Sequence, residues 1–159
     1  MEEFEIFYQK QQEKLFSYLM RITGDYHLST DIMQESFTRY LERYAKETRN
    51  SSLLYAIARN YFLDYKRRNK KSHALEHEEE DYSANQENAL QVKQEYRQVL
   101  SAMKRLDDDE REILALVLDG DISYREIASL VGTSEGNVKV KVHRARVKLK
   151  KILKAGNFP

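Results

Sequence analysis

Apolar residues recur every three or four positions through most of the chain, which is the spacing of amphipathic helices. The first stripe predicts a helix that ends at Gly24–Asp25, where the periodicity breaks. We expect the second helix to begin near Ser29 or Thr30, because either hydroxyl can cap a first turn and Asp31 suits its positive end. The predicted buried faces comprise Phe4, Phe7, Leu15, Tyr18, Leu19 and Ile22, and then Ile32, Met33, Phe37, Tyr40 and Leu41.

A third helix is predicted after a polar loop at residues 45–52. Its apolar positions follow helical spacing, and its later residues 62–65 continue directly into the basic run KRRNKK at 66–71. The apolar positions are Leu53, Leu54, Ile57, Ala58 and Tyr61.

A helix with an acidic start is predicted in the second half of the chain. Residues 107–110 place four acids where the positive end of the helix dipole stabilises them. Gly120 can adopt the left-handed conformation that ends such a helix. Its predicted buried side comprises Ile113, Leu114, Leu116, Val117 and Leu118.

The next two helices have the spacing of a helix–turn–helix. Ser123 and Glu126 have capping-box spacing, and Ala128 is small where two helices must approach closely. Gly132 suits the turn, and Thr133–Ser134 can cap a last long helix.

The start of that last helix is ambiguous, because Val138, Val140 and Val142 alternate with lysines as in a half-buried strand. A strand would bury Val140 with the other valines, whereas a helix would expose it on the opposite face. From Val138 the apolar positions continue at steps of three or four, through Val142, Ala145, Leu149 and Ile152 or Leu153. This periodicity favours the helix.

Composition supports an all-α, soluble, cytoplasmic protein. The 159 residues include one proline, five glycines and no cysteine, so disulfides and thiolate metal sites are excluded. The acidic N-terminus lacks the apolar core of a signal peptide, and no apolar run approaches the ~18 residues of a membrane span. The net charge of +1 is uninformative as a total, so the distribution of charge matters more.

The sequence predicts two small helical domains joined by a polar, flexible linker. Residues 1–72 form one domain, 73–89 the linker and 90–159 the other, because basic, acidic and polar runs at 66–88 cannot bury a core. The acidic run either is a solvated tether or lies against a basic surface, where it would compete with nucleic acid. His73 and His77, with Glu76 or Glu80, are a remote alternative as metal ligands; we predict neither a metal nor a cofactor.

The exposed face of the last helix is basic, and no Asp or Glu occurs from residue 139 to the end of the sequence. Such a helix, entered through a helix–turn–helix, fits the major groove of duplex DNA. Its side chains supply phosphate attraction and contacts to base edges. The alternative is a solvated, lysine-rich helix. The candidate residues are Lys139, Val140, Lys141, His143, Arg144 and Arg146.

Motifs in both halves resemble those of extracytoplasmic-function (ECF) sigma factors, the minimal group of the bacterial sigma-70 family. The first half has Gly24-Asp25, residues 31–37 (DIMQESF) and residues 57–60 (IARN). The second half has residues 123–128 (SYREIA), Gly132, residues 136–139 (GNVK) and Arg144-Ala145-Arg146 with Leu149. The two sets in this order, with this spacing, are strongly specific together.

The resemblance implies a sigma region 2 followed by a sigma region 4. It implies that Asp31, Gln34, Glu35 and Phe37 bind the clamp helices of the polymerase largest subunit, and that the flap is a second contact. The −10 element would be bound and melted by Arg49, Asn50, Arg59, Asn60, Tyr61, Lys66, Arg67 and Arg68. The −35 element would be bound by the basic face defined above, with Ser134 and Asn137 near the phosphates. An anti-sigma factor is a further expected partner.

Three positions depart from the family pattern: Leu53 replaces a common tryptophan, Asp107 a proline and Asn137 a threonine.

The predicted function is a sigma factor that directs promoter-specific initiation by core polymerase. The alternative is a stand-alone helix–turn–helix regulator, which would need a dimerisation element or a ligand pocket. An enzyme is not expected, because the sequence has no P-loop, no Gly-rich dinucleotide motif and no nucleophile context.

Overall fold

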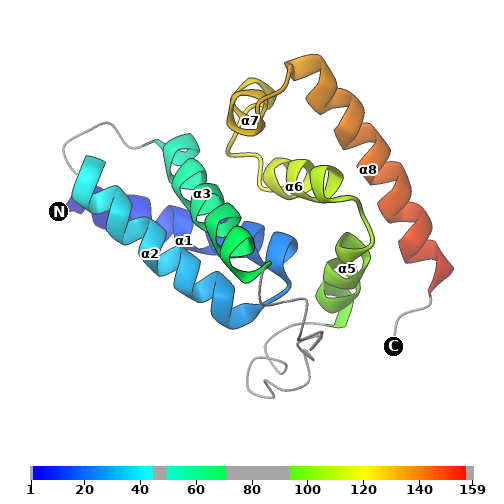
Figure 1. Cartoon of the computed structure of the whole chain (residues 1–159), viewed down its shortest axis with the longest axis horizontal. Coiled ribbons are helices and arrows are strands. Elements are labelled where there is room, and N and C mark those ends of the chain that lie inside the picture. Colours follow the sequence, from blue (N-terminus) through cyan, green and yellow to red (C-terminus); the bar gives the residue numbers. More distant parts are fainter. Residues whose placement is uncertain (1, 45–49, 71–93, 157–159) are drawn as a thin grey trace. The chain divides into compact units, whose positions relative to one another are not determined.

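The computed structural model describes residues 2–44, 50–70 and 94–156, which form seven α-helices and no strand (Figure 1). The predicted all-α fold is therefore confirmed for this part of the chain. Contacts group Met1–Phe16 with Asp25–Gln91 in one unit, and Ser17–Gly24 with Val92–Pro159 in a second. The predicted linker, with His73 and His77, lies outside the described residues. No helix within the described ranges is long and apolar enough to cross a membrane.

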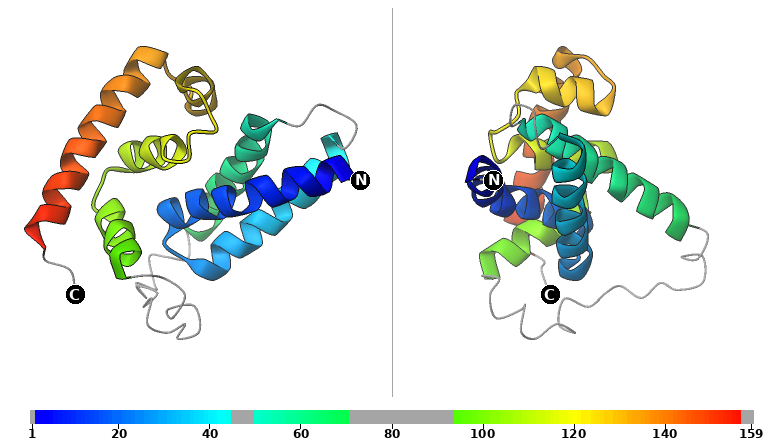
Figure 2. Two further views of the ribbon diagram at one scale, coloured as in Figure 1. Left: turned by 180° about the vertical axis from the view of Figure 1, so that it is seen from behind. Right: turned by 90° about the vertical axis from the view of Figure 1, so that its left-hand side faces the viewer.

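The first unit contains α2 (Tyr26–Tyr44), α3 (Ser51–Asn69) and the part of α1 (Glu2–Thr23) that ends at Phe16, with α3 packed on α2 (Figure 2). The predicted start of α2 near Ser29 or Thr30 is wrong. Gly24 ends α1 at φ 66°, and the Asp25 carboxylate then accepts a hydrogen bond from the Leu28 backbone N–H at 3.0 Å. This carboxylate caps the helix one turn earlier than the hydroxyls would.

Aromatic side chains join α1 to α2. Phe7 stacks on Tyr40 with ring centroids 5.0 Å apart, and Tyr8 lies 4.6 Å from Phe37. Phe4 meets the same Phe37 ring edge-on at 6.4 Å. Because Phe37 and Tyr40 are buried, these contacts fix one face of α2 inward and leave the opposite face to solvent.

The start of α3 is held by α2. The Asn50 side chain accepts a hydrogen bond from the Leu53 N–H, and the Asn50 N–H donates to the Tyr40 hydroxyl at 3.0 Å. The helix therefore begins at Ser51, two residues before the predicted Leu53. Residues 45–49 of the predicted loop are outside the described ranges.

The second unit contains α5 (Gln94–Lys104), α6 (Asp108–Val117), α7 (Tyr124–Val131) and α8 (Glu135–Ala155). Each of the three shorter helices packs on α8, the long helix at the right of Figure 1. Helix α5 was not predicted from the sequence as a separate helix. The acidic start of α6 is confirmed, but Leu118 is 43% exposed just past its last turn, so its predicted burial is wrong.

The helix–turn–helix between α7 and α8 follows the predicted signals. Ser123 and Glu126 form a complete capping box, and Gly132 ends α7 in the left-handed conformation at φ 76°. The Thr133 N–H then bonds to the Ala128 carbonyl, and Ser134 caps α8.

The strand-or-helix question for residues 138–142 is settled in favour of the helix. Val138, Val142 and Ala145 are at most 2% exposed and face the other helices of this unit. Val140 is 46% exposed. Val140 therefore marks the side of α8 that faces solvent.

Candidate functional site

The exposed surface of α8 opposite its buried stripe holds most of the predicted −35 residues. Lys139, Val140, His143, Arg144 and Arg146 are all exposed. Lys139 and Arg146 are seven residues apart, so they lie on the same side of the helix, about two turns from each other. The structure therefore brings this set together on one helix.

The first turn of α8 uses its polar side chains internally. Ser134 Oγ accepts a hydrogen bond from the Asn137 N–H at 3.1 Å. The Asn137 side-chain amide in turn donates to Thr133 Oγ1 at 2.6 Å. Both predicted phosphate-contact residues are thus held in place at the helix start, which presents backbone N–H groups as well.

Two lysines of α8 lie on the flank that faces α6. Lys141 Nζ is 3.3 Å from an Asp109 carboxylate oxygen, and Lys148 Nζ is 2.7 Å from Glu110 Oε1. Lys148 is also 3.6 Å from Asp107. Lys141 was predicted to contact DNA, but the structure separates it from Lys139 and Arg146, which lie on the other flank. The acids of α6 neutralise one side of α8.

The hydrogen bond to Glu110 raises the pKa of Lys148, and the nearby carboxylate charge adds to that rise. We expect Glu110→Gln to lower this pKa toward its ordinary value, as measured by NMR titration of the Lys148 side chain. A raised lysine pKa stabilises the fold below the unfolded pKa, about 10.4, and that contribution disappears as the pH rises through the folded value. The stability gap between wild type and Glu110→Gln should therefore be constant near neutrality and shrink above about pH 10.4. A gap independent of pH through that range would contradict it.

The exposed sides of α3 hold the predicted −10 residues that the structure describes. Asn60 and Arg67 are seven residues apart, as are Tyr61 and Arg68, so these pairs line two adjacent stripes. Asn60, Lys66, Arg67 and Arg68 are exposed, whereas Arg59 and Tyr61 are half-buried. Arg49 lies outside the described residues, and Asn50 serves as the helix cap.

Two cation–aromatic contacts on this surface were not foreseen. The Arg39 guanidinium lies 5.0 Å from the centroid of the Tyr61 ring, and Lys66 Nζ lies 5.4 Å from that of Phe62. One face of Tyr61 is therefore already covered by α2. Arg39 and Tyr61 lie on different helices, so no local pattern indicates their contact. Phe62 and Lys66 are four residues apart on α3, and this helical spacing could have indicated theirs.

The predicted polymerase-binding residues of α2 divide between surface and core. Asp31 and Gln34 are exposed one turn apart. Glu35 lies beside them and pairs with Arg39 at 3.1 Å. Phe37 is 4% exposed within the aromatic cluster, so it supports this helix from inside.

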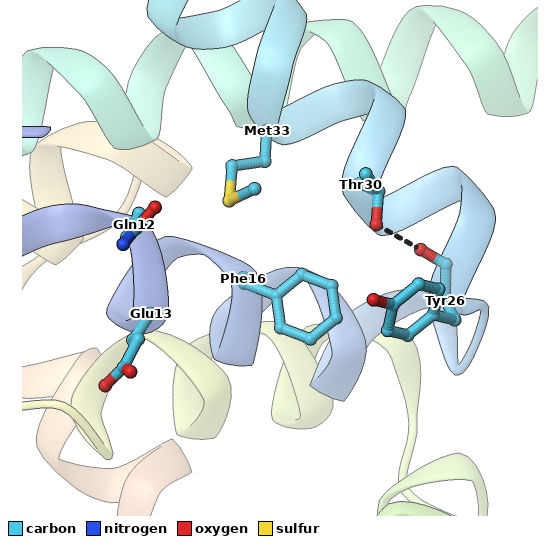
Figure 3. A pocket seen from close by; sticks show the side chains of 6 residues that line it. All are labelled: Gln12, Glu13, Phe16, Tyr26, Thr30 and Met33. Carbon is cyan, nitrogen blue, oxygen red and sulfur yellow. Dashed lines mark hydrogen bonds between the residues drawn. The ribbon is translucent and has the colours of Figure 1, made fainter. Parts of the chain in front are cut away.

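A pocket of about 230 Å³ lies between α1 and α2 (Figure 3). Phe16 and Tyr26 meet edge-on across it at 5.3 Å, Met33 lines it beside them, and Gln12, Glu13 and Thr30 complete the lining. None of the predicted functional residues lines this pocket.

Two family models match successive parts of the chain. Residues 7–72 match the family described as Sigma-70 region 2, and residues 96–149 match Sigma-70, region 4. The chain is 32% identical over 155 residues to the ECF RNA polymerase sigma factor SigM of Bacillus subtilis (strain 168), covering 94% of each chain. It is 31% identical to the ECF RNA polymerase sigma factor EcfG of Rhodopseudomonas palustris (strain TIE-1), covering 87% of this chain and 78% of that protein.

Two solved structures share the fold. The sigma factor RpoE of Bartonella quintana, in complex with the anti-sigma factor NepR, aligns with a TM-score of 0.76 at 19% identity, covering 97% of this chain and 98% of that one. CnrH, in complex with the cytosolic domain of CnrY, aligns at 0.68 with 22% identity, covering 96% and 88%.

A region 2 unit followed by a region 4 helix–turn–helix is the composition of a minimal sigma factor. The chain belongs to the sigma-70 family and, within it, to the ECF group of RNA polymerase sigma factors. The expected family membership and function are thereby confirmed, and the stand-alone regulator is not favoured.

Proposed function

We propose that α8 enters the major groove of promoter DNA at the −35 element. The observation that carries this proposal is the exposed face around Val140, where the helix–turn–helix orients Lys139, His143 and Arg144 to solvent. The N-terminal half of such a helix is the part that reaches base edges. Lys141 is assigned no direct contact, because its ammonium group pairs with Asp109.

The exposed stripes of α3 are proposed to bind the −10 element as a single strand. Arg67, Arg68 and Lys66 supply cations for phosphates, and Asn60 supplies hydrogen bonds to a base. Arg39 covers one face of the Tyr61 ring, so only the opposite face is proposed to stack on a base. The free energy of binding the single strand then stabilises the melted promoter duplex, and no covalent bond forms or breaks. We therefore assign the chain no enzymatic activity.

The acidic face of α2 is proposed to dock on core polymerase. Asp31 and Gln34 are exposed there, and Glu35 is held in place by Arg39. Carboxylates at fixed positions suit arginines on a partner helix, because charge-assisted hydrogen bonds are strong and directional. Since this partner acts on chromosomal DNA, we assign the chain to the cytoplasm.

The variant Asp31→Arg is expected to weaken core polymerase binding at least about tenfold, because like charges opposed across an interface cost several kcal/mol. Fluorescence anisotropy of the labelled chain, titrated with core polymerase, measures this. Glu5→Arg makes the same charge change at an exposed position of α1 and serves as control. Equal binding by the two variants would contradict the assignment of this face.

An anti-sigma factor is proposed as a regulatory partner. The similar RpoE and CnrH folds were each solved with a partner protein, an anti-sigma factor in the case of RpoE. The acidic face of α2 is the surface that such an inhibitor would cover to exclude polymerase.

Run-off transcription tests the proposed function as a whole. Core polymerase is mixed with the chain on a genomic fragment library, and the 5′ ends of the transcripts locate the promoters. We expect transcripts that require the chain and share sequence elements upstream near −10 and −35. If the chain alone binds promoter DNA tightly and does not bind core polymerase, the proposal is wrong.

A further inference from the structure

Val140 is an apolar side chain in the middle of the proposed DNA-binding face. It is 46% exposed, although Val138 and Val142 on either side of it are buried. Its neighbours one turn later are His143 and Arg144, both exposed. A valine contributes nothing to phosphate attraction, so any contribution of Val140 to DNA binding must come from an apolar contact.

The surface on the N-terminal side of Val140 is open. Gly136 lies one turn earlier on the same side of α8, and a Cβ added there would meet no atom within 4 Å. Helical side chains lean toward the N-terminus, so the Val140 methyl groups lean over a position that has no side chain. The exposed methyl groups of Val140 and the open position at Gly136 are called the Gly136–Val140 notch below.

Charged groups border this notch without filling it. Lys139 and Arg144 flank Val140, and both are cations that can bind phosphates or guanine edges in a major groove. Glu135 precedes Lys139 by one turn, so its carboxylate is directed to the flank of Lys139 and away from the notch. In the major groove the one apolar group on a base edge is the C5-methyl of thymine.

We propose that the Gly136–Val140 notch is a specificity subsite that takes the C5-methyl group of one thymine in the −35 element. This inference rests on the proposed −35 role of α8 and adds to it the base that one residue selects. Contact between methyl groups excludes water from both, and the exposed Gly136 backbone lets the base edge come close.

A second exposed valine on the same helix provides a matched control. Val147 is 40% exposed and lies seven residues after Val140, on the same side of α8 and about 10.5 Å further along its axis. That displacement corresponds to roughly three base-pair rises of 3.4 Å. The same apolar side chain at this distance lies beyond the part of the helix that reaches base edges.

The test replaces each −35 thymine, on either strand, by deoxyuridine, which removes only the methyl group. Holoenzyme reconstituted from core polymerase and the chain is assayed on a promoter identified by run-off transcription. We expect one replacement to lower promoter binding by the wild type about fourfold, the effect of one buried methyl-sized group. The Val140→Ala variant should bind the thymine and deoxyuridine promoters equally.

Two further variants make the outcome specific. Val147→Ala should keep the full thymine preference, and Gly136→Ala should reduce it without lowering the thermal stability of the chain. If Val140→Ala retains the preference, or if the wild type shows none while a scrambled −35 element still abolishes transcription, the inference is wrong and the −35 role of α8 stands. If scrambling the −35 element has no effect, the proposed −35 role fails as well.

Discussion

Replacing Arg144 by Ala is expected to reduce −35-dependent transcription between about 5- and 150-fold, the range of one base contact worth ~1–3 kcal/mol. Arg144 is exposed in the third turn of α8, next to His143 and four residues after Val140. At this position the guanidinium can donate two hydrogen bonds to a guanine, a contact that depends on the promoter sequence. Run-off transcription on matched promoters with intact and scrambled −35 elements measures the effect.

The control removes the same charge elsewhere on α8. Lys154 is exposed ten residues later, about 15 Å along the helix axis. That exceeds the Debye length of about 8 Å at physiological ionic strength, so Lys154→Ala should change transcription little. The deficit of Arg144→Ala should vanish on the scrambled promoter, because neither protein can use its −35 contacts there. An equal loss for both variants would mean that net charge, and not the α8 face, determines promoter binding.

The elements predicted correctly from the sequence depend on local interactions. The Ser123–Glu126 capping box and the left-handed Gly132 involve neighbours within a few residues, so their spacing in the sequence nearly determines their geometry. The start of α2 was missed because two sets of capping groups lie within one turn, and the Asp25 carboxylate is used in place of the hydroxyls. Helix α5 was missed because no distinct start or stop signal marks Gln94–Lys104 in the sequence.

The parts of the candidate site that depend only on helical periodicity were predictable from the sequence. Burial of Val138 and Val142 fixes the exposure of Val140, so the central DNA-binding face follows from the spacing of the valines. The pairing of Lys141 with Asp109 spans 32 residues and depends on how α6 packs on α8. The cover of Tyr61 by Arg39 likewise depends on the packing of α2 against α3. Tertiary contacts of this kind leave no local pattern in the sequence.

The largest effect on stability is expected for Leu114→Ala. Leu114 is fully buried in α6, which packs along α8. Truncating such a leucine costs about 2–5 kcal/mol, because the apolar contact is lost and a cavity remains. That is a large fraction of the ~5–15 kcal/mol that stabilises an ordinary domain. Urea unfolding of the full chain, followed by circular dichroism at 222 nm, should show an earlier transition for the second unit.

Leu118→Ala is the matched control, since it removes the same atoms from a leucine that is 43% exposed just after the same helix. Its effect should stay within about 0.5 kcal/mol. The functional consequence of Leu114→Ala should also be selective. Loss of α6 removes the support that fixes the exposed face of α8, so −35-dependent transcription should fall steeply with temperature, while anisotropy titrations should detect unchanged binding of α2 to core polymerase. If Leu114→Ala lost core polymerase binding and −35-dependent transcription together at every temperature, α2 and α8 would not act as separate contacts. The separate roles proposed for these two helices would then be wrong.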